Sequence, residues 1–207
     1  MIYVKDKVMK RALFSILVSL FAAPLFAVTI GQPAPGFALP DLTGSTVKLA
    51  DLQGKYVVLE WVNPECPFVR KHYNSANMPT LQKEAATKDV VWLSINSTNP
   101  KSDEFKTPEQ MKSWLASKNA APKTVLFDRD GSIGHAYDAK TTPHMYIIDR
   151  QGKLIYAGGI DDKRSASIDD IKIAKNFVRV ALDEAMSGKP VSVPTSQPYG
   201  CSIKYAG

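Results

Sequence analysis

Residues 56–72 read YVVLEWVNPECPFVRKH, and this stretch decides the fold. Its first part, residues 56–61, predicts a buried strand, because a short apolar run that is rich in valine is typical of one. Residues 67–88 predict a helix that Pro79 kinks or breaks. Cys66 therefore lies where a buried strand ends and a helix begins.

This position of Cys66 suits a thiolate. The free amides and the dipole at the N-terminus of a helix stabilise a negative charge. Arg70 and Lys71 add positive potential one turn further on, and Glu65 opposes it. A buried structural cysteine fits the same position, so the local sequence leaves both interpretations open.

The flanking sequence predicts an α/β fold. Residues 37–40 and 46–49 predict a hairpin, and residues 149–152 form a short turn that makes the last strand pair antiparallel. Thr107 and Gln110 are typical of a capping box that opens a helix. Further strands are predicted at residues 90–95, 124–127, 145–148 and 154–157, and a last helix at residues 168–186. The order of these elements predicts a mixed β-sheet with helices packed on it.

The N-terminal segment has the layout of a secretory signal peptide. Four basic residues between positions 5 and 11 precede an apolar run over residues 12–28, and small residues precede a cut expected after Ala27. The run has 17 residues, which is at the short edge for an uncleaved membrane anchor, the alternative. We expect a signal peptide at residues 1–27, a domain at residues 28–190 and a tail at residues 191–207.

The charge follows from this segment. The 207 residues carry a net charge of +6, which would fit a nucleic-acid or membrane partner. Removing residues 1–27 takes four of the 26 basic and one of the 20 acidic residues, which lowers the net charge to +3. We therefore expect an exported protein, periplasmic or secreted, without a nucleic-acid partner. Contact with a membrane is expected only through an uncleaved N-terminal segment. The domain would then be anchored on the side of the membrane that faces away from the cytoplasm.

Several motifs resemble the thioredoxin superfamily. Residues 51–59, DLQGKYVVL, are similar to the segment that precedes the nucleophilic cysteine in its exported and peroxiredoxin-like members, and Thr142–Pro143 resembles the family's cis-proline. Residues 66–73 (CPFVRKHY) and 199–205 (YGCSIKY) resemble redoxins related to the alkyl hydroperoxide reductase/thiol-specific antioxidant (AhpC/TSA) family. The resemblance implies a thioredoxin-like fold with a central mixed sheet flanked by helices, an N-terminal hairpin and a C-terminal tail.

Two departures from these families bear on activity. Val69 stands where a thioredoxin-type reductase has its second cysteine. Leu59 and Asn63 stand where an ordinary peroxiredoxin has proline and threonine or serine, so the peroxide-binding motif is only partly present.

The resemblance also implies roles for site residues. Cys66 is the nucleophile, and Cys201 is a candidate resolving cysteine; a permanent structural disulfide or two unpaired cysteines are the alternatives. Glu60 matches the buried acid that relays protons in thioredoxins, with a solvent-facing glutamate as the alternative. We expect His144, next to Pro143, near Cys66, where it would either pair with the thiolate or act as a general base. Arg70 completes the expected catalytic set.

The expected function is that of an exported, peroxiredoxin-like thiol oxidoreductase with an antioxidant role. Cys66 would reduce a hydroperoxide, Cys201 would resolve the product, and an external thioredoxin-like dithiol would restore both. One alternative is a thiol–disulfide oxidoreductase of exported proteins, and another is a Cys/His copper-binding or redox-sensing module without turnover. Two cysteines exclude a four-cysteine zinc site, and we expect no metal and no cofactor.

Overall fold

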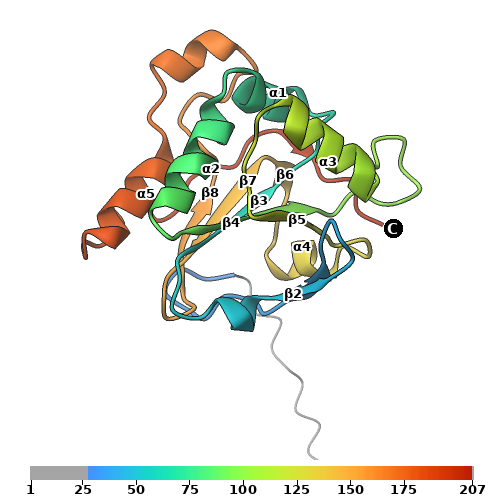
Figure 1. The fold of residues 1–207 in the computed structure, drawn as a ribbon. Coiled ribbons are helices and arrows are strands. Elements are labelled where there is room, and N and C mark those ends of the chain that lie inside the picture. The colour runs from blue at the N-terminus through green and yellow to red at the C-terminus, as the bar shows by residue number, and fades with distance from the viewer. Residues whose placement is uncertain (1–27, 207) are drawn as a thin grey trace, which may run out of the picture.

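A five-stranded mixed sheet forms the centre of the computed structural model, which describes residues 28–206 (Figure 1). The expected signal peptide lies outside the described residues. The strand order is β5-β4-β3-β7-β8. The strands are β3 (Val57–Trp61), β4 (Val91–Asn96), β5 (Thr124–Phe127), β7 (His144–Ile148) and β8 (Leu154–Gly158). The predicted fold class is confirmed, and so is the antiparallel pairing of β7 with β8.

The directions of the strands place the site at one end of the sheet. β3 runs parallel to β4, and β4 parallel to β5, whereas β7 runs antiparallel to β3. The carboxyl end of β3 therefore lies beside the beginning of β7, where Trp61 pairs with His144. Chain segments that leave β3 and enter β7 meet at this end.

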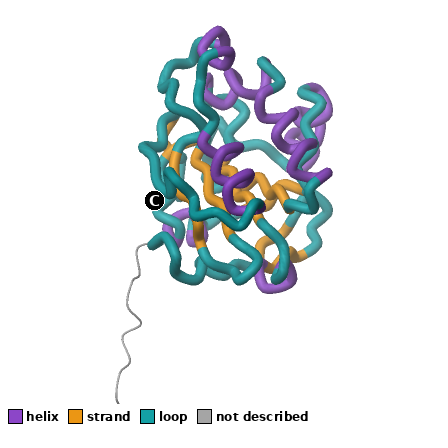
Figure 2. The backbone as a smooth tube through the Cα atoms, turned by 90° about the vertical axis from the view of Figure 1, so that its left-hand side faces the viewer, coloured by secondary structure: helices purple, strands orange, loops and turns teal. Residues whose placement is uncertain are grey.

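Helices and short elements cover the two faces of the sheet unequally. One face packs against α1 (Pro67–Asn74), α2 (Asn77–Thr87), α3 (Pro108–Ser117) and α5 (Phe177–Met186). The hairpin of β1 (Ala38–Pro40) and β2 (Thr46–Lys48), the short 3-10 helix η1 (Leu49–Leu52) and the segment after α4 (Ser132–Ala136) cover the other. Figure 2 shows the strands in the middle with helices and loops around them. The predicted hairpin and the predicted capping box of Thr107 are confirmed.

The helix after Cys66 is broken earlier than Pro79. Ala76 adopts a left-handed conformation between α1 and α2, so the chain turns there. Pro79 lies in the first turn of α2, where a backbone N–H has no partner inside the helix and a proline is tolerated.

The predicted last helix is also two elements. A 3-10 helix, η2 (Ile168–Lys172), is separated from α5 because the side chain of Asn176 accepts a hydrogen bond from the Arg179 amide and caps the new helix. The amide of Phe177 donates to the carbonyl of Ile160, which fixes the start of α5 against the segment after β8.

The tail crosses the end of the sheet, as Figure 1 shows in red, and is bound along its length. Its two-residue strand β9 (Cys201–Ser202) pairs antiparallel with β6 (Thr141–Thr142). Further hydrogen bonds join Ser196 to Ala157 before β9 and Lys204 to Asn99 after it. The tail is therefore held on both sides of Cys201. Within residues 28–206, no helix has the length and apolar character needed to cross a bilayer.

Candidate active site

The thiol of Cys66 lies at the junction that the sequence predicts. Cys66 is the N-cap residue of α1, directly after the loop that leaves β3, and only 1% of its surface is exposed. Its Sγ donates to the carbonyl oxygen of Thr142 at 2.9 Å. The peptide bond between Thr142 and Pro143 is cis, as the resemblance implies. Cys66 and the cis-proline loop therefore lie in direct contact.

Cys201 completes this site from the opposite end of the chain. In the β6–β9 pair Cys201 lies opposite Thr142, and its backbone N–H points to the Sγ of Cys66 at 3.4 Å. Both cysteines are free thiols. Burial and the neighbouring Cys66 thiol raise the pKa of Cys201 to about 12, so Cys201 is protonated at neutral pH. Of the two thiols, that of Cys66 lies at the N-terminus of a helix, where a negative charge is stabilised.

Glu60 is buried in the core on the same face of β3 as Val58 and Val62. Its carboxylate accepts hydrogen bonds from Tyr73 at 2.8 Å and from Trp92 at 2.8 Å. Gln82 and Ser94 donate to it at 3.2 Å each. Burial raises the pKa of Glu60, and these four donors oppose that rise. A solvent-facing position is thus excluded, and the acid shares the Cys66 side of the sheet.

Replacing Glu60 with glutamine is expected to flatten part of the pH dependence of stability. Because its pKa is higher in the fold than in the unfolded chain, the folded protein keeps a proton that the unfolded chain has already released. The unfolding free energy then falls as pH rises between the two pKa values, by up to about 1.4 kcal/mol per pH unit. In urea unfolding at a series of pH values, the stability of Glu60→Gln relative to wild type should rise with pH. A difference that stays constant from acid to neutral pH would contradict this.

His144 does not face Cys66. Neighbouring side chains of a strand point to opposite faces, and Met145 occupies the face that packs with Cys66. The Nδ1 atom of His144 instead lies 3.2 Å from the Lys140 amide and 3.1 Å from the Tyr146 hydroxyl. Burial lowers the pKa of His144 to about 4. The expected general-base role therefore finds no support in the geometry.

Arg70 holds the loop before Cys66, and no contact joins it to the sulfur. Its Nε donates to the Pro64 carbonyl at 3.0 Å, and its guanidinium pairs with Glu65, which also pairs with Lys106. Asn63 supports the same loop, because its Oδ1 accepts from the Glu65 amide at 2.9 Å. These residues fix the backbone that presents Cys66.

The structure also shows site residues that the sequence did not identify. The Thr142 carbonyl contacts the Cys66 thiol, and Tyr199 anchors the tail two residues before Cys201 through a buried cluster of Lys71, His72 and Asp161. Among residues 28–206, no three histidine, cysteine, aspartate or glutamate side chains gather in a way that could hold a metal ion.

The comparison with known protein families matches the part of the chain that builds this site. A family model described as AhpC/TSA family matches residues 30–157, which include Cys66 and the cis-proline. This chain belongs to the AhpC/TSA family. Its fold places it, as an AhpC/TSA protein, among the thioredoxin-like redoxins.

Known relatives of this AhpC/TSA chain include enzymes of two kinds. The thiol-disulfide oxidoreductase ResA of Geobacillus thermodenitrificans is 30% identical over 135 residues, which cover 62% of this chain and 68% of the relative. The mitochondrial thioredoxin-dependent peroxide reductase of Drosophila melanogaster is 28% identical over 174 residues, covering 76% of this chain and 66% of that protein.

Two solved structures are similar to the AhpC/TSA fold described here. An uncharacterized conserved protein from Geobacillus kaustophilus has a TM-score of 0.73 and 30% identity, covering 86% of this chain and 93% of that one. A putative thiol:disulfide interchange protein DsbE from Chlorobium tepidum has a TM-score of 0.52 and 30% identity, covering 63% and 85%. The relative named ResA and the structure of the putative DsbE support an oxidoreductase that works on thiols or disulfides.

Proposed function

We propose that this protein is a thiol–disulfide oxidoreductase whose redox pair is Cys66 and Cys201. The observation that carries the proposal is the β6–β9 pairing, which brings the Cys201 amide within 3.4 Å of the Cys66 Sγ. This arrangement supplies the second thiol that a thioredoxin-type reductase would have at the position of Val69. The similarity to ResA and DsbE supports disulfide exchange more strongly than peroxide reduction.

The exchange reaction has two steps. The Cys66 thiolate attacks one sulfur of a substrate disulfide, forms a mixed disulfide and releases the other sulfur as a thiolate, which takes up a proton. Cys201 then loses its proton as it attacks the Cys66 sulfur, closes the Cys66–Cys201 disulfide and releases the second substrate sulfur as a thiolate, which takes up a proton. Two electrons pass to the substrate, and an external dithiol of the thioredoxin type returns them.

Two neighbouring features have separate roles in this reaction, one in stabilising the Cys66 thiolate and one in accepting its proton. The N-terminus of α1 stabilises the thiolate, both as the attacking group and as the leaving group when the disulfide is reduced. Glu60 is proposed as the acceptor of the Cys66 proton, because it is the buried acid on the same side of the sheet. Slower alkylation of Cys66 by iodoacetamide in Glu60→Gln, but not in Glu84→Gln on the outer face of α2, would support that role.

Peroxide reduction is the second candidate, and the AhpC/TSA family and the Drosophila relative favour it. In that reaction the Cys66 thiolate attacks the hydroperoxide, the O–O bond breaks, Cys66 becomes a sulfenic acid, and the rest of the peroxide leaves as water or an alcohol. Cys201 then displaces water from the sulfenic acid to close the same disulfide. Leu59 and Asn63 weaken this candidate because they depart from the peroxide-binding motif. Arg70 weakens it as well, because its guanidinium is bound to Pro64 and Glu65 and makes no contact with the Cys66 sulfur. Export is proposed with either reaction and rests on the sequence of residues 1–27.

Two parallel reactions test the function. Reduced protein is mixed with an equal concentration of either oxidised glutathione or hydrogen peroxide, and the loss of both thiols is followed by quenching and mass spectrometry. We expect glutathione disulfide to close the Cys66–Cys201 disulfide at least about tenfold faster than peroxide does. Faster closure by peroxide would favour peroxide reduction over disulfide exchange. Two free thiols after both treatments would contradict both functions.

A further inference from the structure

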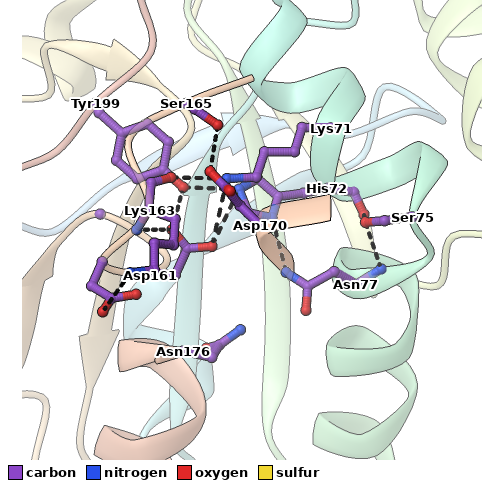
Figure 3. A network of polar contacts seen from close by, with 12 residues as sticks. Lys71, His72, Ser75, Asn77, Asp161, Lys163, Ser165, Asp170, Asn176 and Tyr199 are labelled. Atoms are coloured by element: carbon purple, nitrogen blue, oxygen red, sulfur yellow. Dashed lines mark hydrogen bonds and ion pairs between the residues drawn. The ribbon is translucent and has the colours of Figure 1, made fainter. Parts of the chain in front are cut away.

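A buried charged cluster lies beside the active site and takes no part in the sulfur chemistry. Lys71 and His72 come from α1, and Asp161 follows β8; Figure 3 shows them around the phenol of Tyr199. The side chains of Lys71 and His72 are 0% exposed, and that of Asp161 is 1% exposed. Burying charged groups is unfavourable unless they are paired and hydrogen bonded, so this cluster requires a reason.

Each member of the cluster binds the Tyr199 side chain or a group that does. The Tyr199 hydroxyl donates to the Oδ1 of Asp161 at 2.5 Å and lies 3.1 Å from the Nε2 of His72. The Asn77 amide nitrogen lies 2.9 Å from the Nδ1 of His72, so Nδ1 accepts and the proton on Nε2 points to the phenol oxygen. The phenol is therefore held as both donor and acceptor.

Lys71 is the third member of the cluster and lies over the ring of Tyr199. Its ammonium donates to the Lys163 carbonyl at 2.8 Å, lies 4.0 Å from the Oδ2 of Asp161 and stands 5.6 Å from the centre of the Tyr199 ring. Burial raises the pKa of Asp161, and the hydrogen bonds from Tyr199 and the Lys163 amide oppose that rise together with the charge of Lys71. The edge-to-face contact of Phe68 with Tyr199 closes the pocket.

The chain between this pocket and Cys201 has little freedom. One residue, Gly200, separates Tyr199 from Cys201, and two residues span at most about 7 Å. Gly200 has a φ of 144°, and a Cβ there would lie 2.0 Å from the Thr142 carbonyl oxygen. An anchored Tyr199 therefore restricts where the Cys201 sulfur can lie relative to Cys66.

We propose that Lys71, His72 and Asp161, here called the tail clamp, are positioning residues that hold Tyr199 and thereby keep Cys201 in reach of Cys66. The inference rests on the proposed redox pair. It assigns the residues that set the effective concentration of the Cys201 thiol at Cys66. The clamp touches neither sulfur and acts through Tyr199 alone. Its loss leaves other tail contacts in place, such as the Tyr205 hydroxyl on the Ala139 carbonyl at 2.7 Å.

The two thiol reactions can be timed separately. Reduced protein is mixed with an equimolar aromatic disulfide, dithiobis-nitrobenzoate, which releases a coloured thiolate at each step. The first release reports the attack of Cys66, and the second reports closure by Cys201. A hydrogen bond to a charged group contributes roughly ten- to a hundredfold to an equilibrium constant, so Tyr199→Phe and Asp161→Ala should slow the second release at least about tenfold. The first release should not become slower.

Two further variants control for general effects on the fold. Tyr205→Phe also removes one phenol hydrogen bond from the tail, and it should leave both releases within about twofold of wild type. Asp161→Asn keeps an oxygen that can accept from Tyr199, and it should restore most of the closure rate. An unchanged second release in Tyr199→Phe, or equal slowing in Tyr199→Phe and Tyr205→Phe, would overturn the clamp.

Equilibrium measurements separate the clamp from the proposed function. In glutathione buffers the effective concentration of the Cys66–Cys201 pair should fall by the same tenfold or more in Tyr199→Phe. If wild type closes this disulfide and the variant weakens it while no substrate disulfide is turned over, the clamp stands and the proposed function falls. If the equilibrium is the same in both proteins, the clamp is rejected whatever the activity.

Discussion

The Cys201→Ser variant is expected to stop after the first half of the exchange reaction. Cys66 still attacks a substrate disulfide, but no thiol on the chain is left to attack the mixed disulfide. Turnover should fall at least about a hundredfold, because an intramolecular thiol has a far higher effective concentration than a dilute external one. Steady-state reduction of a small disulfide, with intact-mass analysis of the trapped protein, measures both effects.

The control for this variant is Ser202→Ala, which changes the neighbouring exposed residue of the same strand. It should turn over at close to the wild-type rate and accumulate no mixed disulfide. Normal turnover by Cys201→Ser would show that Cys66 works without a partner on the chain. The β6–β9 contact would then have a structural role only.

The Gly200→Ala variant is expected to have the second large effect, because it separates the tail from Thr142. Its Cβ would lie 2.0 Å from a backbone oxygen, and a side-chain rotation cannot relieve such a clash. Cys66, which is 1% exposed beneath the tail, should then react with iodoacetamide at least about tenfold faster, since local opening controls access to a buried group. Closure of the Cys66–Cys201 disulfide should also be slower in Gly200→Ala than in wild type.

Gly188→Ala is the matched control for Gly200→Ala. Gly188 also has a positive φ, of 72°, but a Cβ there meets no atom within 4 Å. Both variants therefore carry a strained backbone conformation, and only one carries the clash with Thr142. Equal alkylation rates in the two variants would contradict the role of the tail as a cover over Cys66.

The sequence alone predicted the parts of the site that local patterns determine. A valine-rich run followed by a helical segment from residue 67 predicted the strand-to-helix junction at Cys66, because each signal lies within a few neighbouring residues. The capping box at Thr107 was predicted for the same reason. The motif around Pro143 led to the cis bond through the resemblance to a family.

His144 was placed wrongly and Glu60 was left open, and both depend on side-chain orientation within buried strands. All five residues of β7 are buried, so no alternation of polar and apolar residues indicates on which face His144 lies. β3 is buried throughout as well, so the environment of Glu60 was left open. Pattern reasoning has no signal where both faces of a strand pack against the core.

The contacts that bring Cys201 to Cys66 depend on pairing between distant segments. β6 and β9 have two residues each and lie about sixty positions apart, too short and too distant for a hydrophobic pattern to indicate. Lys71 and Asp161 are charged residues whose burial appears only when Tyr199 is placed between them. Their partners, and not their own sequence neighbours, explain their positions.

The most direct test of the redox pair is peptide mapping of the protein after mild oxidation. Reduced protein is treated with a small excess of oxidised glutathione, free thiols are blocked, and the digest is analysed by mass spectrometry without reduction. We predict one dominant linked peptide that joins Cys66 to Cys201 within a single chain and disappears on treatment with a dithiol. Two blocked free thiols, stable glutathione adducts on both cysteines, or links between different chains would contradict the central claim.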